Sequence, residues 1–281
     1  MKNVTIVGLG IIGSAWAKNL HADGLNVRAW NRTRRDFPFF EPDLARAVAG
    51  TEMIIIVVAD PPAVEGLLKV IVPHLKPGRL VVQSSTISAA WTKKFAAQVE
   101  TAGALFLEAP FTGSKPAAEA RKTVYYLGGT KEVIEKARPV LTRLASHLLH
   151  IGPVGTASSL KLAMNLNLAV MSEALSESLA LARAEGIPDD VFFAALHLNA
   201  GRSGFSDLKE PKFRSGDYSP QFSLKHMNKD LRLALETAGD LDLPITKALK
   251  LLYDKGMSNG LAEDDLTGVI RLLAKEKIIA K

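Results

Sequence analysis

The sequence predicts an α/β protein in which an N-terminal Rossmann doubly wound sheet is followed by an all-α C-terminal domain, joined to it by a long interdomain helix. Short β-branched runs alternate with helical stretches up to about Ile151, and continuous apolar strands separated by helices are typical of a parallel sheet covered on both faces. After Ile151 the strand signals stop and only helical patterns follow. These observations place the domains at 1–153 and 154–281.

The expected strands are, in order, NVTIVGL, LNVRAW, MIIIVVA, RLVVQSS, ALFLEA, TVYYLGG and HLLHI. The interval between Arg35 and Met53 is short for an ordinary helix and strand, so we expect "FPFF" to be a vestigial third strand, followed by a helix over about 42–49. "VVADPP" and "SST" follow two of the later strands, at the edge where a doubly wound sheet binds its ligand. Val58, Ala59 and Thr86 are therefore expected to contact a cofactor.

The all-α part is expected to begin with a helix over 157–185, which would extend roughly 43 Å at 1.5 Å per residue. The first half of this helix is apolar on every face, which predicts burial between other elements. Lys161 is the only charged residue from Gly152 to Ser172, so we expect it to point into a buried site or a cleft. Asn165 lies one turn later on the same face. A further helix is expected to open at Ser223.

The composition excludes several classes of function. The chain has 281 residues and no cysteine, which excludes disulfides, cysteine nucleophiles and cysteine-ligated zinc, and its six scattered histidines predict no metal site. The net charge of +6 is not arranged in a continuous basic stripe, so we expect no nucleic-acid partner. No apolar run reaches about 18 residues, so we expect no membrane partner. The first strand begins at Val4, which leaves no room for a signal peptide and predicts a cytosolic protein.

A glycine-rich loop follows the first strand. In "VTIVGLGIIGSAWAKNL", Gly8 suits a tight turn, Gly10 lets backbone amides approach a pyrophosphate, and Gly13 allows close packing of helix on strand. The N-terminus of the helix then faces the phosphates with its partial positive charge, next to Ile11 and Ile12. The strand, the loop and the helix stand in the order that dinucleotide binding requires.

The end of the second strand indicates which dinucleotide binds. An NAD enzyme carries an acid there for the ribose 2′-hydroxyl, but this chain has "NRTRR". The amide of Asn31, the hydroxyl of Thr33 and the guanidinium groups, beginning with Arg32, suit a 2′-phosphate. The sequence therefore predicts NADP in preference to NAD.

Four motifs together resemble the β-hydroxyacid dehydrogenase family, and they occur in the family order over nearly the whole chain. They are "GLGIIGSAWAKNL", "EAPFTGSKPAAE", "GPVGTASSLKLAMN" and "FSLKHMNKDLRLAL". "GSK" in place of the commoner triple glycine, together with "NRT", is most similar to the NADPH-using glyoxylate/succinic semialdehyde reductase branch.

The resemblance implies roles for particular residues. Lys161 matches the catalytic lysine and Asn165 the asparagine that positions the substrate. The loop that binds the substrate carboxylate would be formed by Thr112, Gly113 and Ser114, and the nicotinamide and substrate pocket would be lined by Phe222, Lys229 and Asp230. The resemblance also implies at least a dimer, so a homodimer or homotetramer is expected.

Several positions depart from the family pattern. Phe111 replaces a small aliphatic residue, Thr112 replaces a serine, and Tyr125 and Tyr126 are bulkier than usual. These changes bear on the substrate pocket and leave the reaction intact. For Asp230, an exposed helix acid next to Lys229 is the alternative reading.

The chemistry that follows is reduction of a small aldehyde or 2-oxo acid that bears a carboxylate, with NADPH as the cofactor. Hydride transfer to a carbonyl needs close positioning, stabilisation of the developing alkoxide and a proton. Burial lowers the pKa of a lysine toward neutral pH, which suits Lys161 for the last two tasks. Asn165 would fix the substrate hydroxyl, and the loop at 112–114 would bind the carboxylate.

Four other interpretations are open for the same residues. An imine reductase shares the general plan, although that class usually replaces the lysine, and a non-catalytic NADP-binding protein of the same fold lacks it. A lysine that snorkels at the helix edge is the structural alternative for Lys161. Ser158 and Lys161 also form the S-x-x-K pattern of penicillin-binding enzymes, but neither S-D-N nor K-T-G occurs in the chain.

Overall fold

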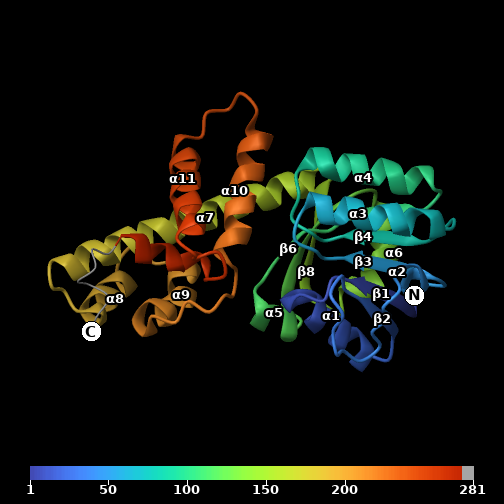
Figure 1. Cartoon of the computed structure of the whole chain (residues 1–281), viewed down its shortest axis with the longest axis horizontal. Helices are drawn as coiled ribbons and strands as arrows, with labels where there is room; N and C mark the ends of the chain where they lie inside the picture. Colours follow the sequence, from blue (N-terminus) through green and yellow to red (C-terminus); the bar gives the residue numbers. More distant parts are fainter. Residues whose placement is uncertain (274–281) are drawn as a thin grey trace. The chain divides into compact units, whose positions relative to one another are not determined.

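The computed structural model describes residues 1–273, so residues 274–281 of the predicted second domain lie outside the described part (Figure 1). The chain forms two compact units, which divide after Leu162, inside a long helix. The first unit is a sheet covered by helices and the second is helical, which confirms the predicted fold class.

The sheet of the first unit is mixed and mostly parallel. Its strand order is β2-β1-β3-β4-β5-β7-β6, and β8 pairs with β7. The pairs from β2 to β5 and the pair β7–β8 are parallel, whereas β7 runs antiparallel to β5 and β6. The strands are β1 (Asn3–Val7), β2 (Asn26–Trp30), β3 (Met53–Ile56), β4 (Leu80–Gln83), β5 (Leu105–Glu108), β6 (Phe111–Thr112), β7 (Thr123–Gly128) and β8 (Ala145–Gly152).

A single parallel bridge between Ala29 and Phe40 stands where a third Rossmann strand would be. The amide of Ala29 donates to the Phe39 carbonyl at 3.0 Å, and the amide of Glu41 donates to the Ala29 carbonyl at 2.9 Å. The helix α2 (Leu44–Val48) follows, with Asp43 as its N-cap. The vestigial strand in "FPFF" and the short helix after it are therefore confirmed.

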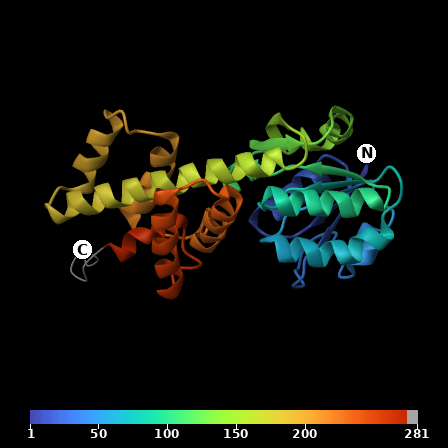
Figure 2. The same ribbon diagram turned by 90° about the horizontal axis from the view of Figure 1, so that it is seen from above.

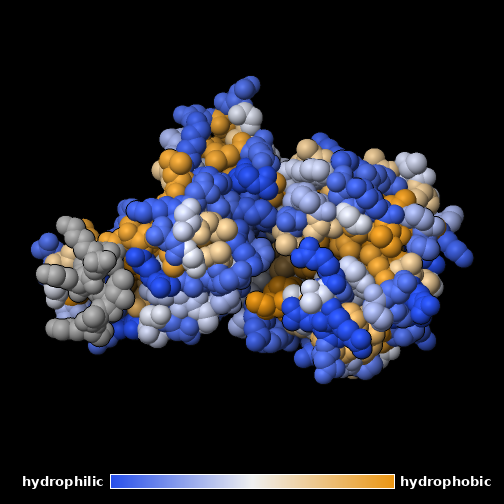
Figure 3. Space-filling view, in the orientation of Figure 1, coloured by the Kyte–Doolittle hydropathy of each residue, from blue (hydrophilic) through white to orange (hydrophobic). Residues whose placement is uncertain are grey.

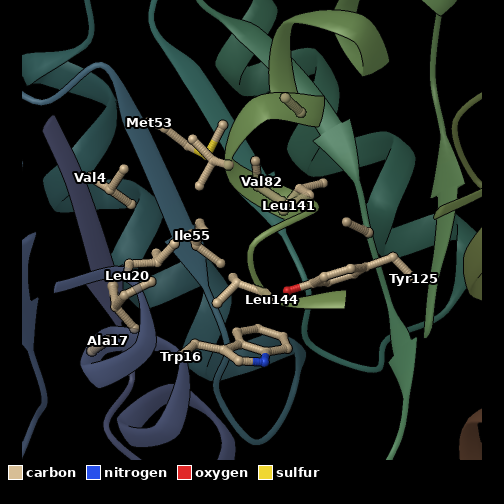
Figure 4. Close-up of a cluster of buried hydrophobic side chains, with 14 of the residues drawn as sticks. Val4, Trp16, Ala17, Leu20, Met53, Ile55, Val82, Tyr125, Leu141 and Leu144 are labelled. Atoms are coloured by element: carbon tan, nitrogen blue, oxygen red, sulfur yellow. The ribbon is translucent and has the colours of Figure 1, made fainter. Parts of the chain in front are cut away.

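Helices cover both faces of the sheet. The other helices of this unit are α1 (Ile11–Ala22), α3 (Pro61–Ile71), α4 (Ala89–Thr101), α5 (Lys115–Glu119) and α6 (Lys131–Leu141), with a 3-10 turn, η1 (Val72–His74). Alternate strand residues face opposite sides: Ile55 and Val82 pack toward α1 and α6, whereas Ile54 and Val81 pack toward α3 and α4 (Figures 1 and 4). Continuous apolar strands are thus buried on both faces, as the sequence pattern predicts.

The helix α7 (Thr156–Ala184) runs unbroken, as Figure 2 shows. Its expected burial on every face is wrong, because Ala163 is exposed and Met164 is 40% exposed. A stripe spaced by three and four residues is buried instead, and this stripe carries polar side chains as well as apolar ones. The buried polar members are Ser158, Lys161, Asn165, Ser172, Glu173 and Ser176.

The second unit continues with α8 (Asp189–His197), α9 (Gly204–Ser215), α10 (Leu224–Ala238), α11 (Pro244–Ser258) and a 3-10 turn, η2 (Leu266–Leu272). The helix predicted to open at Ser223 is α10, with Ser223 as its N-cap. A buried ion pair joins Lys209 of α9 to Asp265 before η2 at 2.8 Å. The same carboxylate accepts the backbone amides of Gln221 and Phe222, so it fixes the segment that leads into α10.

Candidate active site

The glycine loop has two glycines that serve packing and one that faces open space. A Cβ on Gly8 would lie 2.1 Å from the Val57 carbonyl oxygen, and one on Gly13 would lie 1.9 Å from the Gly8 carbonyl oxygen. Around the Cβ position of Gly10, the described part of the chain places no heavy atom within 4 Å. The loop is therefore packed tightly at Gly8 and Gly13 and open at Gly10, which is the shape that a pyrophosphate needs.

The N-terminus of α1 is open to a ligand. Gly10 is its N-cap, and within residues 1–273 no side chain caps it. The first helical residue, Ile11, is 47% exposed, and Ile12 is half-buried against the core. The amides of this first turn are therefore available to an anion, in line with a phosphate site at a helix N-terminus.

Asn31 supports the loop from the end of β2. Its side-chain oxygen accepts the Leu9 amide at 3.1 Å, and its side-chain nitrogen donates to the Thr33 carbonyl at 2.9 Å. Arg32 and Thr33 are exposed beside it. An open cavity of about 560 Å³ lies next to this turn, lined by Arg34, Arg35, Asp36, Phe37 and Phe40. Guanidinium groups thus gather where the ribose 2′ position of a dinucleotide is expected.

The carboxyl ends of β3 and β4 lie at the same edge of the sheet as the glycine loop. Val58 and Ala59 follow β3, Thr86 follows β4, and both strands lie beside β1, whose end leads into the glycine loop. The Val58 amide donates to the Ser85 hydroxyl at 2.8 Å. The structure therefore brings the expected cofactor residues of the sheet unit together, and Ser85 is a supporting residue that the sequence alone did not reveal.

The loop predicted to bind a carboxylate surrounds Gly113. Thr112 belongs to the short strand β6, which was not predicted. Gly113 has a φ of +127°, a region that L side chains rarely adopt. Ser114 is the N-cap residue of α5, and its hydroxyl makes no capping bond with the described residues. The hydroxyls and amides of this loop are therefore candidates for holding an anionic group.

The bulky residues near this loop serve the core of the unit. Tyr125 is completely buried, and its ring lies 5.3 Å from that of Trp16 (Figure 4). Phe111 packs on Trp16 with ring centroids 4.8 Å apart. From its position on β7, Tyr125 points into the core of the first unit.

Lys161 is buried, with 7% of its surface exposed. The first turn of α7 is held from two sides just before it. Glu108 accepts the backbone amide of Ser158 at 2.6 Å, and the hydroxyls of Thr92 and Ser158 lie 2.8 Å apart. This burial favours a lysine inside a site over a side chain that snorkels at the helix edge.

Asn165 is bound to Asp230 within the second unit. Its side-chain nitrogen donates to the carboxylate at 2.6 Å, and the other carboxylate oxygen lies 2.9 Å from the Lys229 ammonium. Asn165 and Asp230 are each 2% exposed, so the alternative of a surface acid at Asp230 is wrong. The Asn165 side-chain oxygen is buried and finds no hydrogen-bond partner among residues 1–273. Asp230 therefore orients the amide and leaves its oxygen available.

Phe222 is half-buried at the start of the same segment. Its amide donates to Asp265 at 3.3 Å, and its carbonyl accepts the Leu266 amide at 2.9 Å. The neighbouring His226 ring stacks on it, and burial, with Lys229 and Lys225 nearby, lowers the pKa of that histidine. His226 is a further residue of this group that the motif reading did not single out.

Two other properties bear on the kind of site. In residues 1–273 there is no cluster of three or more His, Asp and Glu side chains that could hold a metal ion. None of the described helices is both long and apolar enough to cross a membrane.

Known protein families match both units of the chain. Residues 3–152 match the NAD-binding domain of 6-phosphogluconate dehydrogenase, and residues 155–273 match the NAD-binding region of NADP-dependent 3-hydroxyisobutyrate dehydrogenase. Glyoxylate/succinic semialdehyde reductase 2 of Arabidopsis thaliana, a chloroplastic protein, is 30% identical over 98% of this chain and 80% of its own length. NAD-dependent L-serine dehydrogenase of Pseudomonas aeruginosa is 30% identical over 97% of this chain and 98% of its own length.

A solved structure extends the likeness to three dimensions. The 3-hydroxyisobutyrate dehydrogenase of Mycobacterium tuberculosis, determined with L-serine, has a TM-score of 0.87 and 26% identity, covering 98% of this chain and 100% of its own. The two matched family models together span both units, and the two relatives named above are a reductase of glyoxylate and succinic semialdehyde and a dehydrogenase of L-serine. The resemblance drawn from the four motifs is therefore confirmed, and the chain belongs to the β-hydroxyacid dehydrogenase family.

Proposed function

We propose that the protein is an NADPH-dependent reductase of a small aldehyde or 2-oxo acid that bears a carboxylate, such as glyoxylate or succinic semialdehyde. The observation that carries this proposal is the buried Lys161 on α7, one turn before an Asn165 whose amide is oriented by Asp230. A lysine and an amide held in this way fit proton transfer to, and hydrogen bonding of, a substrate oxygen.

The residues of the first unit fit a nicotinamide dinucleotide. The open space at Gly10 and the uncapped start of α1 would receive the pyrophosphate, and Val58, Ala59 and Thr86 would line the path toward the nicotinamide. Among residues 1–273, no acid follows β2 directly, and Arg32, Arg34 and Arg35 are exposed there instead. Charge complementarity with a 2′-phosphate supports NADP over NAD.

When bound, NADPH would supply the hydride for the carbonyl carbon. Lys161 donates a proton to the carbonyl oxygen as it gains negative charge, and solvent returns a proton to the amine after each turnover. The Asn165 amide keeps that oxygen in place, and the amides and hydroxyls at Thr112, Gly113 and Ser114 bind the substrate carboxylate. By the motif resemblance Phe222 and Lys229 would contact the cofactor, and Asp230 keeps Asn165 oriented. In the oxidative direction Lys161 takes the proton from the hydroxyl.

Turnover by the purified enzyme tests this function. NADPH consumption is measured with glyoxylate, succinic semialdehyde and methylmalonate semialdehyde, and again with NADH. We expect turnover of at least one substrate and a kcat/KM that favours NADPH by more than about ten-fold, as expected where guanidinium groups bind a 2′-phosphate. Tight NADPH binding without turnover of any carbonyl substrate, but with reduction of a cyclic imine, would replace the proposal with an imine reductase. Binding with neither activity would leave a non-catalytic NADP-binding protein.

We also propose a homodimer or homotetramer, located in the cytosol. Apolar side chains gather on the outer side of α11, visible as the orange area over that helix in Figure 3. Ile245 and Leu251 of this helix are 61% and 71% exposed. Exposed apolar side chains on one helix support contact between copies of the chain. Light scattering of the purified protein at several concentrations tests the proposal, and a monomer at all of them would refute it.

A further inference from the structure

Glu108 is a completely buried carboxylate that contacts the helix carrying Lys161. It is the last residue of β5, in the interior of the sheet unit. Its Oε2 accepts the Gly155 amide at 2.7 Å, and its Oε1 accepts the Ser158 amide at 2.6 Å. Both amides belong to the start of α7, where helix N–H groups have no partner inside the helix. Each oxygen thus faces an N–H donor, which fits the ionised carboxylate.

The surrounding residues are shaped around this carboxylate. Gly128 of β7 is the direct cross-strand partner of Glu108, and a Cβ on Gly128 would lie 2.0 Å from Oε2. Gly155 has a φ of +103°, which directs its amide without a side chain in the way. Both glycines therefore leave room for the Glu108 carboxylate and its hydrogen bonds. Burial raises the pKa of Glu108, and the hydrogen bonds from Ser158 and Gly155 act against that rise.

The hydrogen bonds of Glu108 to the start of α7 affect Lys161 through the helix. Lys161 follows Ser158 by three residues, so the two lie on one face of α7, and the Cα–Cβ bond of a helical residue leans toward the helix N-terminus. The lysine therefore leans toward the turn that Glu108 holds. Other groups around this turn are Thr92 of α4, which bonds the Ser158 hydroxyl, and the exposed Lys93, whose stem packs at Gly155. Of these, Glu108 alone brings negative charge.

We propose that Glu108 is the positioning residue of Lys161: its carboxylate binds the first turn of α7, fixes where the lysine amine acts and supplies the negative charge beside that turn. This inference rests on the proposed role of Lys161 as the proton donor. Glu108 acts through the helix and does not touch the substrate. A plain helix cap would stabilise the fold in the same way without any effect on the reaction, and the experiment must separate the two.

Glu108→Gln and Thr92→Val form a matched pair, because each removes a buried contact to the same turn and only the first removes a charge. Both are expected to lower Tm. Glu108→Gln is expected to lower kcat by about 10- to 100-fold, the cost of a small misplacement of a reacting group, with the Kd for NADPH within about two-fold of the wild type. Thr92→Val is expected to keep kcat within about three-fold. Equal kcat in both variants and the wild type would overturn the proposal.

A second readout does not depend on turnover. The Lys161 side-chain signal of lysine-labelled protein is identified by its loss in Lys161→Arg, and its titration is followed by NMR. Removal of the nearby negative charge is expected to move the titration midpoint of Lys161 to lower pH in Glu108→Gln and not in Thr92→Val. Unchanged midpoints in both variants would overturn the proposal. A shift in an enzyme that reduces no carbonyl would refute the proposed function and keep the link between Glu108 and Lys161.

Should Glu108→Gln fail to fold, Glu108→Asp takes its place. Aspartate keeps the charge, but it is one methylene too short to reach both amides. We expect a reduced kcat and a titration midpoint of Lys161 near that of the wild type. Full activity would show that the contacts of Glu108 with the start of α7 do not position the lysine.

Discussion

The side-chain nitrogen of Asn165 donates to the Asp230 carboxylate at 2.6 Å, and both side chains are buried. The bond fixes the orientation of the Asn165 amide: its nitrogen must face the Asp230 carboxylate, because only the nitrogen can donate a hydrogen bond. An oxygen of Asn165 is left for a substrate group. Asp230 thus orients the side chain of Asn165, which lies one turn from Lys161, although Asp230 is far from both in sequence.

Asp230→Asn removes the charge that orients Asn165. We expect kcat to fall by about 10- to 100-fold with little change in the Kd for NADPH, because one hydrogen-bonded positioning group is lost. Asp254→Asn is the matched control, since Asp254 accepts a 3.1 Å bond from Asn228 between the same two kinds of side chain. Its kcat should stay at the level of the wild type, and an equal loss in both variants would argue against the role of Asp230.

The three glycines of the first loop separate binding from stability. Gly13→Ala places a methyl group 1.9 Å from the Gly8 carbonyl oxygen and should destabilise the fold by about 1–3 kcal/mol. The structure has room for the methyl group of Gly10→Ala, so the free energy of unfolding of this variant should equal that of the wild type. The Kd for NADPH should rise by about ten-fold, because the methyl group occupies the approach to the phosphates. Denaturant unfolding and fluorescence titration measure the two effects. Unchanged NADPH affinity in Gly10→Ala would move the cofactor away from this loop.

Glu173 makes stability depend on pH. Burial, with a smaller contribution from Glu177, raises the pKa of Glu173 from 4.5 to about 7, and neither oxygen has a hydrogen-bond partner among residues 1–273. The folded state binds the proton more tightly than the unfolded state does, so stability falls as pH rises from about 4.5 to about 7 and then levels off. The loss amounts to about 3 kcal/mol.

Glu173→Gln should remove that loss and raise the unfolding free energy at pH 8 by about 1–3 kcal/mol, because the buried charge is gone. Glu185→Gln, at an exposed position near the end of the same helix, should have no such effect. The measurement is denaturant unfolding at pH 5 and pH 8. A difference between the two pH values that persists unchanged in Glu173→Gln would place the pH dependence elsewhere.

Tyr125→Phe tests the assignment of that tyrosine to the core. Burial raises the pKa of Tyr125 well above its usual value, and its hydroxyl finds no hydrogen-bond partner in the described part of the chain. Removing the hydroxyl should leave KM unchanged and keep or raise Tm, since an unpaired buried polar group costs about 1–3 kcal/mol. Tyr253→Phe is the contrast, because the Tyr253 hydroxyl donates to the Leu266 carbonyl and its loss should lower Tm. A changed KM in Tyr125→Phe would return this residue to the substrate pocket.

Much of the fold could be predicted because its signals are local. The order of strands, the glycine loop and the long helix all follow from short-range patterns, and the length of the interval between Arg35 and Met53 was enough to predict a vestigial strand. The two-residue strand β6 has no periodicity to detect. The inward direction of Tyr125 depends on an antiparallel register that its own sequence does not encode.

The candidate site divides in the same way. Lys161 and Asn165 stood out through an unusual charge and a helical spacing, and Asp230 through a motif. Glu108 opens one of the four motifs, but the motif gave it no role of its own, because its contacts depend on Gly128 and on amides some 50 residues away in the chain. Contacts between distant segments are set by packing, and a single sequence does not show them.

The substitution Lys161→Ala tests the central claim most directly, with kcat for the best carbonyl substrate and the Kd for NADPH measured on the same preparation. We predict a loss in kcat of about 100- to 10,000-fold, the usual contribution of a general acid, while the Kd for NADPH and Tm stay near those of the wild type. Turnover by Lys161→Ala at the rate of the wild type would contradict the assignment of the buried lysine as the proton donor.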